Sequence, residues 1–136
     1  MKTAVYWIEK LNLEKHPEGG WFREIYRSED VAPESGLPKN FTGKRNFLTS
    51  IYFLLEDNDF SAFHRIKSDE IWHYYAGTSA IEILSLEKGK LKKYLVGNNP
   101  DRGQIFQVIV PKNTWFAARL QNPEGYALAG CTVSPG

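Results

Sequence analysis

Short runs of apolar residues, separated by turn signals, recur along this sequence. Residues 21–28 (WFREIYRS) alternate between two faces, which predicts an edge strand or a strand with one face over a polar cavity. Residues 47–56 (FLTSIYFLLE) are continuously apolar, as is typical of a strand buried on both sides. The β-branched and aromatic run 71–75 (IWHYY) also predicts a strand. Further strands are predicted in the hairpin 80–96 and in the runs 105–111, 114–120 and 126–133.

One short helix is predicted at the N-terminus. Thr3 can cap it, and Val5, Ile8 and Leu11 then form one apolar face. About eight or nine short strands with regular turn signals indicate a sandwich or barrel rather than a parallel βαβ fold. The chain shows no internal repeat, and its 136 residues form one domain, 1–136, long enough to bury a core.

Two polar segments interrupt the apolar pattern. Residues 16–20 (HPEGG) combine proline with paired glycines and predict a turn, in which His16 is structural or at the surface. Glu18 and the two glycines are candidates for shaping a dimer contact. Residues 29–44 (EDVAPESGLPKNFTGK) predict a long loop, which suggests a lid or a subunit contact in so small a domain.

Composition and charge narrow the class of protein. The net charge of +1 provides no electrostatic reason to expect nucleic acid or an acidic membrane surface as a partner. No run approaches the ~20 apolar residues of a membrane span, and Glu9 and Lys10 interrupt the first apolar stretch too early for a signal peptide. We therefore expect a cytoplasmic protein. The single cysteine, Cys131, excludes an internal disulfide and is interpreted as a buried thiol.

The densest chemistry lies in residues 61–77 (SAFHRIKSDEIWHYYAG). His64 and Glu70 are separated by a polar bend, so two consecutive strands can bring an imidazole and a carboxylate together inside a cavity. A histidine and a carboxylate surrounded by aromatic rings are sufficient for proton transfer, in which His64 would be the base. Glu70 would then hold the tautomer of the imidazole or raise its basicity.

An isomerase or epimerase also needs an acid on the opposite face of its substrate. Tyr52, Tyr74 and His73 are the candidates, and the sequence does not choose among them. Strict alternation from Glu70 places His73 on the other face of the strand, unless a bulge intervenes.

The alternative is that the protein binds a ligand without catalysing a reaction, which requires fewer specifically placed groups. Arg23 or Arg45 could hold a phosphate or carboxylate group of a small polar ligand. Trp72 or Trp115 could stack on a sugar or a base. The blandest interpretation of the His64–Glu70 pair is that the two groups satisfy one another within a barrel.

The spacing of these residues resembles the first motif of cupins, which are small jelly-roll barrels. That motif reads Gly, five residues, His-x-His, three or four residues, Glu, six residues, Gly. His64, Glu70 and Gly77 follow the spacing, whereas Asn58 stands at the leading glycine and Ile66 at the second histidine. The resemblance implies a mainly β fold, a cupin double-stranded β-helix (jelly-roll) barrel with a short N-terminal helix.

The chain is more specifically similar to the cupin-5 family, also called DUF985, whose activity is unassigned. The matching segments cover nearly the whole chain: HPEGGWFREIYRS, TSIYFLL, FHRIKSDEIWHYYAG, VPKNTWFAARL and GCTVSPG. The resemblance implies a homodimeric jelly roll, and some members are grouped as predicted epimerases by analogy with sugar-nucleotide epimerases. Because fold does not determine function, that grouping is an expectation only.

A cupin metal site requires three histidines and one carboxylate. The resemblance places His64 and Glu70 at two of these positions, while Ile66 and Phe116 occupy the other two. Two protein ligands rarely hold a divalent ion tightly, so no cofactor is expected, unless His73 replaces a lost ligand. A metal-dependent oxygenase is therefore the least favoured function.

We expect the protein to bind a small polar ligand inside the barrel. The ligand would be a sugar, a sugar nucleotide or a nucleotide. Either a metal-independent isomerase or epimerase acts on it with His64 as base, or the protein binds it without turnover.

Overall fold

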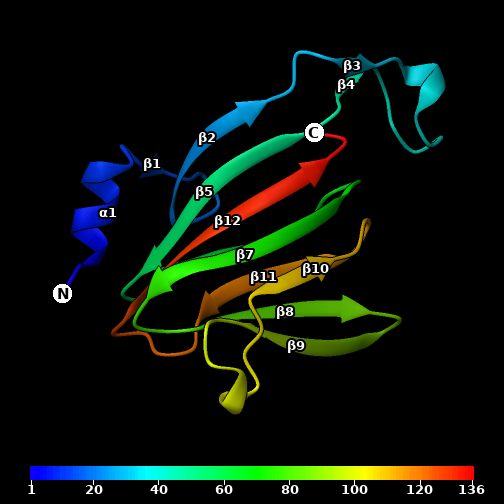
Figure 1. Ribbon diagram of the computed structural model, residues 1–136. Helices are drawn as coiled ribbons and strands as arrows, with labels where there is room; N and C mark the ends of the chain where they lie inside the picture. The colour runs from blue at the N-terminus through cyan, green and yellow to red at the C-terminus, as the bar shows by residue number, and fades with distance from the viewer.

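The computed structural model describes residues 1–136 and consists mainly of two facing antiparallel β-sheets (Figure 1). The larger sheet has six strands in the order β1-β2-β5-β12-β7-β10, and the smaller has four in the order β6-β11-β8-β9. The six are β1 (Glu14–Lys15), β2 (Trp21–Arg27), β5 (Thr49–Glu56), β12 (Tyr126–Ser134), β7 (Asp69–Gly77) and β10 (Gln107–Val110). The four are β6 (Phe60–Arg65), β11 (Trp115–Leu120), β8 (Ile81–Glu87) and β9 (Lys90–Val96). This is the predicted jelly-roll arrangement.

The strand predictions from hydrophobic periodicity are confirmed. Every predicted strand is present, and β5 is buried on both faces as its continuous apolar run indicated. Phe53 and Leu55 point into the core between the two sheets, while Leu54 joins a second cluster on the outer face of the larger sheet. Neighbouring residues of a strand point to opposite faces, so one strand contributes to both clusters.

The core between the sheets is a single cluster of fifteen buried residues, and Phe116, Ile81, Ile83 and Leu55 are among its fully buried members. Cys131 belongs to it, with 3% of its surface exposed. Burial, with Glu70 nearby, raises the pKa of the Cys131 thiol, so the side chain acts as an apolar filler and not as a nucleophile.

Helix α1 (Ala4–Lys10) covers part of the outer face of the larger sheet (Figure 1). The Thr3 hydroxyl accepts a hydrogen bond from the Tyr6 amide at 3.3 Å, which confirms the predicted N-cap. Trp7 and Ile8 pack on the outer cluster, and Trp7 Nε1 donates to the Tyr126 hydroxyl at 3.1 Å. None of the helices has the length and apolar character that crossing a membrane would require.

The long segment 29–44 is less irregular than expected. It contains β3 (Val31–Ala32), which pairs with β4 (Arg45–Asn46), and a short 3₁₀ helix, η1 (Glu34–Gly36). A second 3₁₀ helix, η2 (Pro100–Arg102), precedes β10. Whether the segment 29–44 acts as a lid or a subunit contact stays a prediction.

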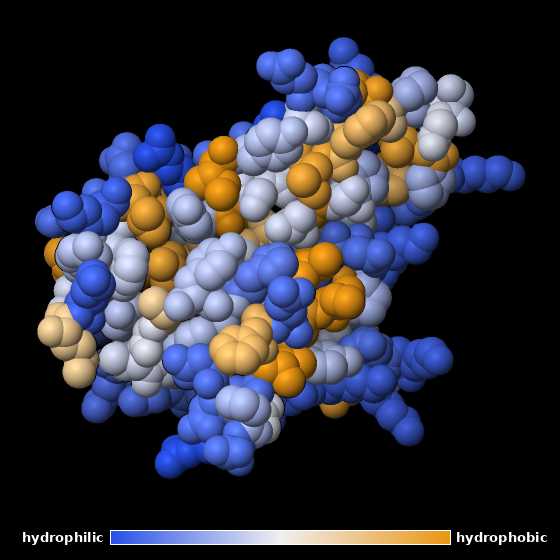
Figure 2. Space-filling view, viewed as in Figure 1, coloured by the Kyte–Doolittle hydropathy of each residue, from blue (hydrophilic) through white to orange (hydrophobic).

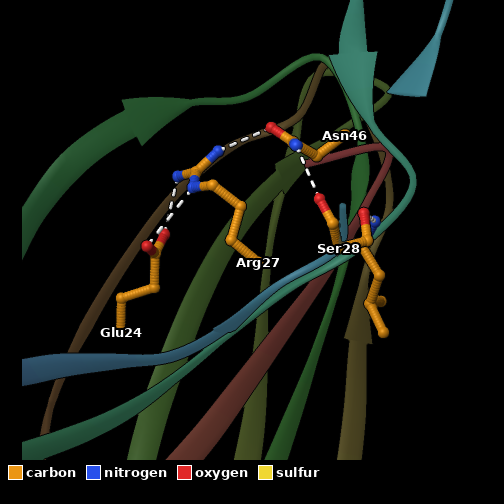
Figure 3. Close-up of polar contacts among 5 residues, drawn as sticks. Glu24, Arg27, Ser28 and Asn46 are labelled. Carbon is orange, nitrogen blue, oxygen red and sulfur yellow. Dashed lines mark hydrogen bonds and ion pairs between the residues drawn. The ribbon is translucent and has the colours of Figure 1, made fainter. Parts of the chain in front are cut away.

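A polar network holds the base of this segment to the larger sheet (Figure 3). Arg27 donates to Glu24 at 2.6 and 3.2 Å and to Asn46 Oδ1 at 2.9 Å. Asn46 Nδ2 then donates to the Ser28 carbonyl at 2.8 Å. The Arg27–Glu24 ion pair and the Asn46 amide link the residues just before the segment 29–44 to those just after it. Both ends of the segment are therefore held at the same place on the larger sheet.

Candidate functional site

The site begins with the glycine turn at residues 16–20, which packs against β6. The Ala62 amide donates to the Glu18 carbonyl at 3.1 Å, and the His16 amide donates to the Gly20 carbonyl at 2.8 Å. Gly19 and Gly20 have φ values of 113° and 79°, a region that other residues rarely adopt. A Cβ on Gly19 would overlap the Phe60 carbonyl oxygen. Glycine at position 19 is therefore required for the turn to approach β6 this closely, and a Cβ on Gly20 would press on Phe53 and Leu54 of β5.

This close approach places the Glu18 carboxylate beside His64. Glu18 Oε2 lies 3.2 Å from His64 Nδ1, and the Ala62 carbonyl oxygen lies 2.7 Å from the same nitrogen. Since a carbonyl oxygen can only accept, Nδ1 carries the hydrogen and donates it. Nε2, at the opposite edge of the ring, is then left with a free lone pair. The His64 side chain is 25% exposed, so solvent or a small ligand can reach it.

Glu70, on β7, is the second ionisable group of the site. Its Oε1 accepts a hydrogen bond from Trp72 Nε1 at 2.7 Å. Burial raises the pKa of Glu70 from 4.5 to about 7, despite opposing effects from the Trp72 hydrogen bond and the His64 charge. At neutral pH the carboxyl group is therefore close to half-protonated, which suits a group that gives and takes a proton.

Aromatic rings connect the glycine turn to Glu70. The His16 ring packs edge-on against Phe53 with centroids 5.8 Å apart, and Phe53 packs in the same way against Trp72 at 5.5 Å. On the other sheet, the Phe116 ring lies 4.3 Å from the His64 ring. Of these rings, that of Trp72 contacts Glu70 directly, and burial of the carboxyl group is the cause of its raised pKa.

His16 belongs to this site, although the sequence indicated only a structural or surface role. Its Nδ1 accepts a hydrogen bond from the Glu18 amide at 3.0 Å. Burial and the nearby His64 lower the pKa of His16, while Glu18 opposes them. A neutral His16 therefore helps to hold the turn that carries Glu18.

The raised pKa of Glu70 predicts a pH-dependent stability. The folded protein holds this proton more tightly than the unfolded chain, so the contribution is complete below pH 4.5 and is lost as pH rises through about 7. Glu70→Gln retains a hydrogen-bond acceptor for Trp72 but cannot ionise. We expect wild type to lose on the order of 2 kcal/mol relative to Glu70→Gln between pH 5 and 8, measured by urea unfolding. An equal pH dependence for the two proteins would show that Glu70 is not desolvated.

The other proposed catalytic and ligand-binding residues on β5 and β7 are placed differently. Tyr74 faces the barrel interior, but it lies two inward positions beyond Glu70, and its hydroxyl donates to the Ser79 carbonyl at 2.9 Å. Burial raises the pKa of Tyr74 to about 12. His73 and Tyr52 lie on the outer face of the larger sheet, where His73 Nε2 is 3.4 Å from the Thr132 hydroxyl. Only Trp72 is brought together with His64 and Glu70.

The candidate anion-binding and stacking residues also lie outside this cluster. Arg23 donates to the Leu11 carbonyl at 3.3 Å. The Arg45 guanidinium lies 5.4 Å from the centroid of the Phe41 ring, in the segment around β3 and β4. Trp115 is exposed on the outer face of the smaller sheet, with the Arg65 guanidinium 5.2 Å from its ring. None of these side chains is part of the group formed by His64, Glu70 and Trp72.

The residues present do not fit a cupin metal site. Phe116 is fully buried against the His64 ring, and Ile66 packs against the same core, so two of the four ligand positions carry no donor atom. No group of three or more His, Cys, Asp or Glu side chains is arranged to hold a metal ion.

A separate concavity lies on the outer side of the smaller sheet and encloses about 440 Å³. Phe60, Phe63, Leu84, Ala117 and Arg119 are among its lining residues. His64 and Glu70 do not line it, so this concavity and the ionisable cluster are different features.

Sequence reasoning missed Glu18 and His16 as members of the site. Their signal was the paired glycine, because positive φ values allow close contact with another backbone. The sequence does not show which strand the turn approaches, and that contact decides the role of Glu18.

Comparisons with known proteins agree with this architecture. A Leishmania major protein described as hypothetical has a structure that superposes with a TM-score of 0.87, at 32% identity, covering 99% of this chain and 82% of that one. A Shewanella oneidensis protein gives a TM-score of 0.86 at 36% identity, covering 100% and 80% of the two chains. An uncharacterized Saccharomyces cerevisiae protein is 31% identical over 121 residues, which are 83% of this chain and 59% of the yeast protein.

Two facing antiparallel sheets around a site at the first cupin motif define a cupin. The family model described as Cupin superfamily (DUF985) matches residues 5–136, and the chain belongs to that family. The predicted family and fold class are thus confirmed.

Proposed function

We propose that this cupin is a metal-independent acid–base enzyme that isomerises a small polar carbonyl compound with a hydroxyl group next to the carbonyl. The observation that carries the proposal is the hydrogen bonding of His64, whose Nδ1 faces an obligate acceptor. His64 Nε2 is therefore available as a base, and the adjacent Glu18 carboxylate stabilises the imidazolium that forms when it takes a proton.

Glu70 supplies the complementary acid. Nε2 of His64 removes a proton from the carbon next to a carbonyl group, and the protonated Glu70 donates its proton to the carbonyl oxygen. The resulting enediol collapses to the isomer when Glu70 takes the proton of the second hydroxyl group and His64 returns its proton to the neighbouring carbon. A carboxyl group with a pKa of about 7 is suited to both directions of this transfer.

The experiment that tests this proposal follows exchange of carbon-bound hydrogen with solvent. Small aldoses, ketoses, sugar phosphates and sugar nucleotides are incubated in D₂O with wild type, His64→Gln or Glu70→Gln, and proton NMR monitors loss of the signal next to the carbonyl. We expect exchange with at least one compound, and only with wild type. Binding of a compound by wild type without exchange of any carbon-bound proton would instead identify a binding protein without chemistry.

We further propose that the protein is a homodimer, with an apolar patch on and just before β10 at the interface. Ile109 on β10 is 60% exposed, and Ile105 and Phe106, just before this strand, are 49% and 56% exposed. Figure 2 shows apolar side chains gathered where β10 lies in Figure 1. Exposed apolar residues that are neighbours in space are typical of subunit contacts.

Sedimentation velocity tests the dimer with one matched pair of variants. Ile109→Lys places a charge in the patch, and we expect it to shift a dimeric wild type to monomer. Leu91→Lys changes a residue of similar exposure, 62%, next to the turn of the β8–β9 hairpin, where it pairs with Leu86, and should leave the dimer intact. A monomeric wild type, or a dimer lost only with Leu91→Lys, would contradict this interface.

A further inference from the structure

No lysine or arginine forms an ion pair with Glu18 or Glu70, the two carboxylates of the site. Glu18 Oε2 is 3.2 Å from His64 Nδ1. His64 and Glu18 are the charged groups that shift the pKa of Glu70, and the same two shift the pKa of His16. The site thus consists of two carboxylates and two imidazoles. It contains no permanent positive charge.

The basic residues that are adjacent in sequence turn away from the site. Arg65 follows His64 on β6, but its guanidinium lies 5.2 Å from the Trp115 ring on the outer face of the smaller sheet. The Lys15 ammonium, next to His16, lies 4.4 Å from the Trp21 ring and 4.0 Å from Asp59. Both cations are engaged elsewhere, so neither is held ready for an anionic ligand.

The groups that are present suit hydroxyl donors and a carbon skeleton. Carboxylate oxygens accept hydrogen bonds from hydroxyl groups, and Glu18 and Glu70 each have an oxygen outside the contacts already described. The rings of Phe116 and Trp72 add apolar surface beside these polar groups. A polyhydroxy compound presents both kinds of surface.

We infer that this site selects an uncharged polyhydroxy carbonyl compound and discriminates against the phosphate ester or nucleotide conjugate of the same compound. The inference rests on the proposed function, because it concerns the ligand of the same site. A phosphate group placed here would face Glu18 without a permanent cation to pair with and would lose hydration that a lysine or arginine would otherwise replace. An uncharged hydroxyl group meets neither cost.

The test compares each free sugar with its own phosphate. Ring-nitrogen NMR of His64 is recorded while D-glucose, D-fructose and D-ribose, their terminal phosphates, UDP-glucose and inorganic phosphate are titrated in separate experiments. We expect saturable shifts with at least one free sugar and binding of its phosphate that is weaker by about tenfold or more. A phosphorylated compound or inorganic phosphate that binds at His64 as tightly as the free sugar would overturn the inference, as would a panel in which no free sugar perturbs His64.

Two variants show whether Glu18 causes the discrimination. Glu18→Gln removes the charge beside His64, and we expect the affinity ratio between a free sugar and its phosphate to shrink towards one. Glu14→Gln removes the same charge from an exposed position on β1 and should leave the ratio unchanged. Equal ratios in wild type and Glu18→Gln would contradict the role of Glu18.

The outcome separates this inference from the proposed function. If a free sugar binds at His64 but exchanges no carbon-bound proton, the charge selectivity stands and the catalytic proposal fails. If a sugar phosphate binds and exchanges its proton, the catalytic proposal stands and the charge selectivity fails.

Discussion

His64→Gln is expected to reduce the rate of carbon-bound proton exchange by about 10²–10⁴-fold, the usual contribution of a positioned acid–base group. Glutamine retains a hydrogen-bonding side chain of similar reach but cannot take a proton. Because His64 is partly exposed and lies outside the buried core, we expect the fold to survive the substitution. The exchange rate in D₂O and the circular dichroism spectrum measure the two effects.

His73→Gln is the matched control for this prediction. His73 is on β7 like Glu70, but it contacts Thr132 on the outer face of the larger sheet. We expect His73→Gln to exchange at the wild-type rate. Equal losses in the two histidine variants would place the chemistry elsewhere or attribute it to general destabilisation.

Gly19→Ala is expected to destabilise the fold and to displace Glu18 from His64. The added methyl would overlap the Phe60 carbonyl oxygen, and φ at this position is 113°. The turn must therefore move away from β6, which breaks the hydrogen bond between the Ala62 amide and the Glu18 carbonyl. We expect a loss of about 3 kcal/mol in the free energy of unfolding, measured with urea at 25 °C.

Gly89→Ala provides the comparison. Gly89 also has a positive φ, 76°, but a Cβ there would meet no atom within 4 Å. Only the backbone cost remains, about 1 kcal/mol. If the two alanine variants lose the same stability, then the contact between the turn and β6 does not constrain Gly19.

The strands could be predicted from the sequence because their signal is local. Alternation, β-branched residues and turn residues are properties of neighbouring positions, and these marked β5 and the hairpin of β8 and β9 correctly. The pairing order of the two sheets is not local, and it entered only through the resemblance to cupins. The short strands β3 and β4 were missed because two-residue pairings leave almost no periodic pattern.

The candidate site could be predicted only in part. His64 and Glu70 followed from the spacing of the two residues, and Trp72 was named only as a candidate for stacking on a ligand. Glu18 joined them through a contact between a turn and a strand more than forty residues away, which no local pattern records. Arg23 and Arg45 were proposed as anion-binding groups from residue type alone. Residue type does not show towards which part of the fold a side chain points.

The most direct measurement of this site is the tautomer of His64, read from the ring-nitrogen NMR signals of wild type and Glu18→Gln near neutral pH. The hydrogen bond to the Ala62 carbonyl predicts a hydrogen on Nδ1 and a bare Nε2 in neutral wild type, with a larger share of the other tautomer in Glu18→Gln. A hydrogen on Nε2 in neutral wild-type His64 would contradict its role as the base.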